Sequence, residues 1–230
     1  MSKVRLNIAT PKQRFEAFSQ NVLKMTGQAS KINPLGFSNQ LREIGDVFVA
    51  ENQKEMMNKC SQRLAETLVS QKCMALAGRV YSYLIKFNQG NRDVVEKCAT
   101  NGLIIAKRAH DAVHIMARAN DLKEIYRYTQ PNSDKHLSVL FDEKKALNSI
   151  VKDYESAKRR YVSAHTEMKP VERYEEQLAA IKVEIAEVLI KRKEPGAAKV
   201  ELRGALEIYE RIGKGANSEK AENILRKLGG

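Results

Sequence analysis

The stretch Val183–Leu228 reads VEIAEVLIKRKEPGAAKVELRGALEIYERIGKGANSEKAENILRKL, and it decides the fold. Its apolar residues recur every three or four positions, which is the period of one face of an α-helix. Pro195 suits the first turn of a second helix, because its missing N–H would have no partner there. Gly213 and Gly215 are expected to end that helix, since glycine favours helix C-termini. We therefore expect two packed helices and the start of a third.

Small and large residues follow each other at fixed intervals in the first two of these helices. Six residues carry the pattern: Ile185, Ala186 and Leu189 in the first helix, and Ala198, Leu202 and Ala205 in the second. This spacing resembles one tetratricopeptide repeat, in which small residues let two helices approach and large ones fill the gap. The family's early tryptophan is missing, because the chain contains none. The resemblance implies an all-α fold of antiparallel helical hairpins stacked as a short right-handed solenoid.

The same pattern occurs upstream, with unequal intervals between its copies. It is carried by Ile44, Gly45, Phe48, Ala77, Gly78, Tyr81, Ala99, Leu103 and Ala106. Gly45 and Gly78 lie 33 positions apart, close to the family period of about 34 residues. The periodicity predicts about eight or nine helices in all.

Three segments are expected along the chain. Residues 1–33 form a basic N-terminal arm and a first helix, residues 34–130 a helical repeat lobe, and residues 131–230 a long helix followed by the tetratricopeptide-like hairpin. The long helix is expected from Asp134 to about Thr166 because apolar residues recur every three or four positions there. We expect it to pair with the helix that follows Pro170.

The chain is basic, and its positive charge is unevenly distributed along the sequence. The formal net charge is +12, and residues 1–33 alone contain six Lys or Arg against one Glu. Such an arm is a candidate contact for phosphate or for acidic protein. Dedicated nucleic-acid folds more often gather their cations on one helix or loop. Nucleic-acid binding through residues 1–33 is therefore the second hypothesis, behind protein binding.

No catalytic or metal site can be read from the sequence. His110 and His114 have zinc-ligand spacing, but Asp111 stands where metalloproteases have the longer glutamate, and a third ligand would have to be His136 or His165. We favour helix surface and partial core for these histidines. We expect no metal and no other cofactor, and no enzyme activity, because no nucleophile stands with a base.

The cysteines and the hydropathy of the chain indicate the cellular compartment in which it is expected. Cys60, Cys73 and Cys98 form no CxxC pair and indicate reduced thiols. No apolar run reaches the roughly 18–20 residues of a membrane span, and the first residues have no apolar core of a secretory signal. We expect a protein of the cytoplasm or another reducing compartment, with no membrane partner.

The resemblance implies a soluble scaffold or adaptor that binds another protein or peptide. Polar residues of the inner helices would then face the partner: Gln40, Arg42, Arg79, Lys86, Lys182 and Arg192. Their cations suit an acidic peptide, because charged hydrogen bonds to carboxylates are strong. The third hypothesis is a structural subunit that self-associates through the long helix.

Overall fold

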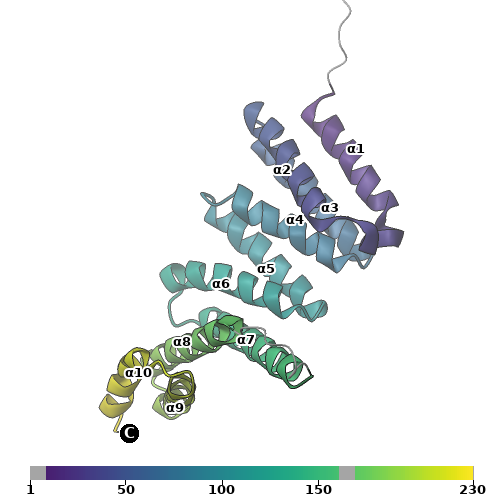
Figure 1. Cartoon of the computed structure of the whole chain (residues 1–230). Coiled ribbons are helices and arrows are strands. Elements are labelled where there is room, and N and C mark those ends of the chain that lie inside the picture. The colour runs from purple at the N-terminus through teal and green to yellow at the C-terminus, as the bar shows by residue number, and fades with distance from the viewer. Residues whose placement is uncertain (1–8, 161–168, 230) are drawn as a thin grey trace, which may run out of the picture. The chain divides into compact units, whose positions relative to one another are not determined.

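The computed structural model describes residues 9–160 and 169–229, and this part of the chain is helical and contains no strand (Figure 1). It forms ten α-helices and one 3₁₀ helix: α1 (Pro11–Lys24), η1 (Thr26–Lys31), α2 (Pro34–Ala50), α3 (Lys54–Ser70), α4 (Met74–Phe87), α5 (Arg92–Arg108), α6 (Ala112–Thr129), α7 (Asp134–Arg160), α8 (Lys169–Lys191), α9 (Pro195–Arg211) and α10 (Gly215–Lys227). The expected all-α class is confirmed. Residues 1–8 of the expected basic segment 1–33 lie outside the described residues.

The chain divides into two compact units, the first ending at Ala109 and the second beginning at His110. In each unit the helices pack mainly on their neighbours in sequence, α1 to α5 in the first and α6 to α10 in the second. These divisions differ from the expected segments 1–33, 34–130 and 131–230. The physical reason is that α6 packs along α7 as a hairpin, so the proline turn at residue 131 joins two helices of one unit.

Four helix ends share one turn geometry, and this explains the repeated hairpins. After α2, α3, α8 and α9 a residue adopts a left-handed backbone: Asn52, Lys72, Lys193 and Gly213. At each end the next N–H donates to the carbonyl five residues earlier, as from Gln53 to Phe48 at 2.7 Å and from Glu194 to Leu189 at 2.9 Å. This is the Schellman motif, which satisfies the last carbonyls of a helix and reverses the chain.

The first unit begins with a capping box at Thr10. The Thr10 hydroxyl accepts a hydrogen bond from the backbone N–H of Gln13, and the Gln13 side chain accepts one from the backbone of Thr10. In α2 the cap is Asn33, whose side chain accepts from the N–H groups of Leu35 and Gly36. The proline turn before α2 is therefore the start of that helix.

The predicted packing residues of the first unit are largely buried. Phe48, Ala77, Tyr81, Ala99, Leu103 and Ala106 belong to the core, while Ile44 is half-buried. The two predicted repeat glycines differ. A Cβ on Gly45 would lie 1.8 Å from the Tyr83 hydroxyl, whereas a Cβ on Gly78 would meet nothing within 4 Å. Only Gly45 therefore permits a close approach of two helices.

The second unit contains the stretch that decides the fold, and its predicted packing residues lie in the core. Ile185, Ala186, Leu189, Ala198, Leu202 and Ala205 are all buried in one core cluster. The α8–α9 hairpin is closed by α10, which packs on α9 (Figure 1). Gly213 ends α9 as expected, but Gly215 begins α10.

The long helix α7 has 27 residues, which gives about 40 Å at about 1.5 Å per residue. Its expected continuation to Thr166 lies outside the described residues. It packs on α8, as expected, and the rings of Tyr154 and Tyr174 stack between the two helices at 5.9 Å. None of the described helices combines the length and apolarity needed to cross a membrane.

Candidate binding site

A cleft of about 370 Å³ lies among α6, α7 and α8 of the second unit. We call it the α6–α8 cleft, and it is lined by Met116, Ala117, Asn120, Lys123, Glu143, Gln177, Ala180, Ile181 and Glu184. The volume falls in the lower part of the range of roughly 300–1,000 Å³ for ligand pockets. The lining combines apolar side chains with amides and charges, which is the composition of a binding site.

Helical periodicity brings these side chains together. On α6, Met116, Asn120 and Lys123 are spaced by four and three positions, so they lie on one face. On α8, Gln177 and Glu184 are seven positions apart and share a face in the same way. The small side chains at positions 117 and 180 leave open volume between the helices.

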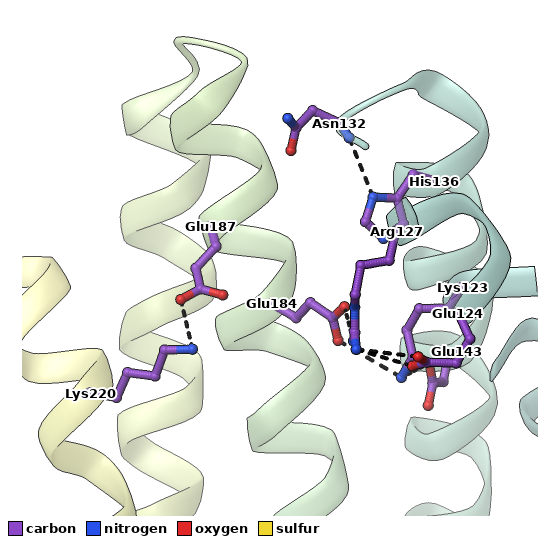
Figure 2. Close-up of polar contacts among 9 residues, drawn as sticks. All are labelled: Lys123, Glu124, Arg127, Asn132, His136, Glu143, Glu184, Glu187 and Lys220. Atoms are coloured by element: carbon purple, nitrogen blue, oxygen red, sulfur yellow. Dashed lines mark hydrogen bonds and ion pairs between the residues drawn. The ribbon is translucent and has the colours of Figure 1, made fainter. Parts of the chain in front are cut away.

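A network of ion pairs spans the cleft (Figure 2). The Lys123 Nζ lies 3.0 Å from Glu143 Oε2 and 3.8 Å from Glu184 Oε2. The Arg127 guanidinium lies 2.7 Å from Glu184 Oε1 and 3.2 Å from Glu124 Oε1. Three helices thus contribute to one charged cluster, which fixes the side chains at the cleft.

Glu143 is the most unusual member of the cluster because it is a buried carboxylate, only 8% exposed. Burial raises its pKa, although Lys123 acts in the opposite direction. Removal from water disfavours a charge, and a single partner at 3.0 Å does not fully offset that cost here. A second cation near this carboxylate would therefore favour its charged form.

His136, at the start of α7, is also buried and lies close to Arg127 (Figure 2). Burial lowers its pKa, and Arg127, Lys123 and Lys191 act in the same direction, against Glu184. Its Nδ1 is 3.4 Å from the backbone N–H of Asn132 and accepts from it, which requires the unprotonated nitrogen. The imidazole is therefore neutral near pH 7.

Other carboxylates of α8 tie this helix to its neighbours. Glu187 pairs with Lys220 of α10 at 2.7 Å (Figure 2), and Glu175 pairs with Arg211 of α9 at 2.8 Å. Glu176 pairs with Lys214. These pairs join different helices, so they brace the scaffold that carries the cleft.

Two of the predicted partner-contacting residues already have carboxylate partners within the chain. Lys182 Nζ lies 3.4 Å from Glu201 Oε2. Arg192 lies 2.7 Å from Asp134 Oδ1 and 3.0 Å from Glu194 Oε1. Neither residue lines the α6–α8 cleft. Their main role in the free chain is to join helices of the second unit.

The other four predicted contacts lie in the first unit. Gln40 lines a second cavity, of about 440 Å³, between α1 and α2. Arg42 and Lys86 are exposed, and Arg79 is half-buried. The six residues are thus divided between the two units. Contact of these cations with an acidic peptide stays a prediction.

The zinc spacing of the two histidines is not reproduced in space. His110 lies in the turn before α6 with a φ of 52°, while His114 lies on α6, where its Nδ1 is 2.7 Å from Asp111 Oδ2. Asp111 caps the helix by accepting from the His114 N–H. Among residues 9–160 and 169–229, no group of three or more His, Cys, Asp or Glu side chains is arranged to hold a metal. His165 lies outside those ranges.

The sequence analysis did not single out Lys123 or Glu143. The signal was present, because Glu143 stands three positions after Leu140 and four before Leu147, which are both fully buried. A charge within an apolar stripe indicates a buried polar group that needs a partner. Lys123 stands in the same way four positions after Ala119 and three before Tyr126, which are both buried.

Comparisons with known proteins give a limited result. No protein-family model matches the sequence, and no curated protein matches it. The solved structure of BtubC (BKLC) from P. vanneervenii is 12% identical, with a TM-score of 0.30 over 89% of this chain and 93% of that chain. The de novo designed helical repeat protein DHR64 is 14% identical, with a TM-score of 0.24 over 95% of this chain and 92% of that chain. Scores this low carry no information about function.

Proposed function

We propose that the protein is a helical scaffold that binds a segment of another protein in the α6–α8 cleft. The observation that carries this proposal is the cleft itself, a cavity of about 370 Å³ with apolar and charged lining. A segment entering it would bury apolar surface on Met116 and Ile181 and meet charged groups that fix its orientation.

The bracing of the cleft supports this proposal. Ion pairs join α8 to α6, α9 and α10, as in Arg127–Glu184, Glu175–Arg211 and Glu187–Lys220. A surface that is already ordered loses little entropy on binding, which favours affinity. The buried small residues of the α8–α9 hairpin suit a tetratricopeptide-like arrangement, and this finer family relation is part of the proposal.

We propose binding in preference to catalysis because of the chemistry of the lining. The charged groups of the cleft are occupied in ion pairs, and its described lining includes no serine, threonine or cysteine as a nucleophile. Cys60, Cys73 and Cys98 are free thiols. This suits a reducing compartment such as the cytoplasm, where we place the protein.

Affinity capture from a lysate of the source organism tests the proposal, with and without nuclease. The test variant is Ala180→Phe, which fills the cleft from an exposed position of α8. The matched control is Ala197→Phe, which adds the same ring to an exposed position of α9 outside the cleft. We expect a defined set of proteins on the wild type and on A197F, and its loss from A180F.

Three results would overturn the proposal. Retention of the same proteins by A180F would place the binding surface elsewhere. Loss of all partners after nuclease treatment would favour the nucleic-acid hypothesis, in which the basic residues 1–33 contact phosphates and binding weakens steeply with salt. Recovery of the protein alone would favour self-association.

A further inference from the structure

The charged cluster at the α6–α8 cleft is not electrically balanced. Its members are two cations, Lys123 and Arg127, and three carboxylates, Glu124, Glu143 and Glu184. Of these residues, one cation, Lys123, and two carboxylates, Glu143 and Glu184, line the cleft, so the lining itself carries one net negative charge when ionised. Opposite charge attracts across a partly buried site more strongly than in water, so the cleft favours a positive group and disfavours an anion.

The cleft also has more hydrogen-bond acceptors than donors to satisfy them. An ionised carboxylate offers about four acceptor positions, and an ammonium group only three donors. Lys123 lies between Glu143 and Glu184, at 3.0 Å and 3.8 Å. The side-chain amides of Asn120 and Gln177 line the same space and each add two acceptor positions and two donors, so the surplus of acceptors comes from the two carboxylates. A group rich in donors fits this lining.

Burial makes Glu143 the anchor for such a group. Its side chain is only 11% exposed, and burial raises its pKa despite Lys123. A second cation nearby would stabilise the charged carboxylate. The ion pair with Lys123 therefore leaves a further gain to be made from a second cation that a partner supplies.

The apolar part of the lining favours a cation that also has apolar surface. Met116, Ala117, Ala180 and Ile181 offer surface for a methylene stem or for the flat face of a guanidinium. Arginine has five donors in a planar fork and is more weakly hydrated than the ammonium of lysine. We infer that the α6–α8 cleft receives an arginine side chain of the partner segment, an inference that rests on the proposed function.

Two short peptides test this inference on the full-length chain. One is an acetylated and amidated alanine pentapeptide with a central arginine, and the other has citrulline there, which keeps the shape and removes the charge. Methyl signals of Met116, Ala180 and Ile181 report binding by NMR. We expect the arginine peptide to bind at least about tenfold more tightly, because charged hydrogen bonds are roughly twice as strong as neutral ones.

Two glutamate variants assign the effect to the cleft. Glu143→Gln removes the buried charge, and Glu175→Gln removes an equally buried charge of α8 that pairs with Arg211 away from the cleft. We expect E143Q to lose most of the preference for arginine over citrulline and E175Q to keep it. The comparison of the two peptides on the wild type stays decisive even if E143Q folds poorly.

The outcomes separate this inference from the proposed function. Equal binding of both peptides, or an arginine preference that survives in E143Q, would overturn the arginine assignment. If A180F still abolished partner capture in that case, the scaffold proposal would stand and only the partner's chemistry would be wrong. If A180F captured partners normally, the proposed function would fail whatever the peptides do.

Discussion

Gly45 and Gly78 have equivalent places in the sequence pattern and opposite surroundings in the structure. A Cβ at position 45 would lie 1.8 Å from the Tyr83 hydroxyl oxygen and 2.9 Å from its Cζ, where ordinary contacts begin at 3.4 Å. The Tyr83 ring stacks on Phe87 with centroids 5.3 Å apart, and its hydroxyl is buried without a hydrogen-bond partner among the described residues. The ring therefore has little freedom to retreat.

We predict that Gly45→Ala lowers the free energy of unfolding, while Gly78→Ala raises it. Overpacking costs about 1–3 kcal/mol, and alanine in place of a helical glycine gains about 0.5–1 kcal/mol. The net expectation is a loss of about 1–2 kcal/mol for G45A. For G78A, whose Cβ meets nothing within 4 Å, we expect a gain of about 0.5–1 kcal/mol. Urea unfolding followed by far-UV circular dichroism measures both.

The same experiment in a Tyr83→Ala background tests the cause. Without the ring, the clash is gone and Gly45→Ala should become stabilising, so the two sites should show strong coupling. If G45A and G78A changed the free energy of unfolding of the wild type in the same direction, the reasoning would be refuted. A penalty for G45A that persisted without the Tyr83 ring would refute it as well.

Three further predictions concern the second unit. Burial lowers the pKa of His136 in the folded chain below the ordinary value of 6.5. As pH falls below 6.5, the unfolded chain therefore binds more protons than the folded chain. The contribution of neutral His136 to stability is complete above that pH and is lost as pH falls below it. His136→Gln should flatten this dependence of the melting temperature on pH. Lys193→Gly should stabilise by up to about 1 kcal/mol, because a left-handed backbone costs a side chain about that much. Lys123→Met should destabilise by about 3–5 kcal/mol, since it leaves the buried Glu143 without its nearest cation.

Each of these predictions has a matched control. His110→Gln removes an exposed imidazole, and an equal effect on the pH profile would remove His136 from the explanation. Lys191→Gly changes a lysine two positions earlier, within α8, and should destabilise, so stabilisation by both would contradict the turn argument. The double variant K123M/E143L should recover most of the loss in urea unfolding, and an additive loss would contradict the ion-pair account.

Sequence patterns predicted the helices well because residues close in sequence determine where a helix begins and which face is apolar. The cap at Thr10, the proline at the start of α9 and the small-large-small set of that helix all follow from residues close in sequence. In α3, by contrast, the small residues in the core are Ser61 and Ala65. Which small residues of this helix face the core depends on the neighbouring helices, which the sequence pattern does not specify.

The candidate site could not be predicted as a whole because it depends on contacts between distant helices. Lys123 and Glu143 are 20 positions apart, and Glu184 is 41 beyond Glu143. Helical periodicity places Glu184 on α8 but does not show that Lys123 and Arg127 of α6 pair with it. Some helices end at a lysine with a left-handed backbone, such as Lys193. Glycine is the usual residue at this position, so the sequence did not indicate these turns.

The footprint of a captured partner tests the central claim most directly. Hydrogen exchange of the full-length chain, free and partner-bound, reports which helix amides become slower to open. The account predicts slower exchange concentrated in residues 120–127 of α6 and 177–184 of α8. Protection confined to α2 and α4, around Arg42 and Lys86, or to residues 1–33, would contradict it.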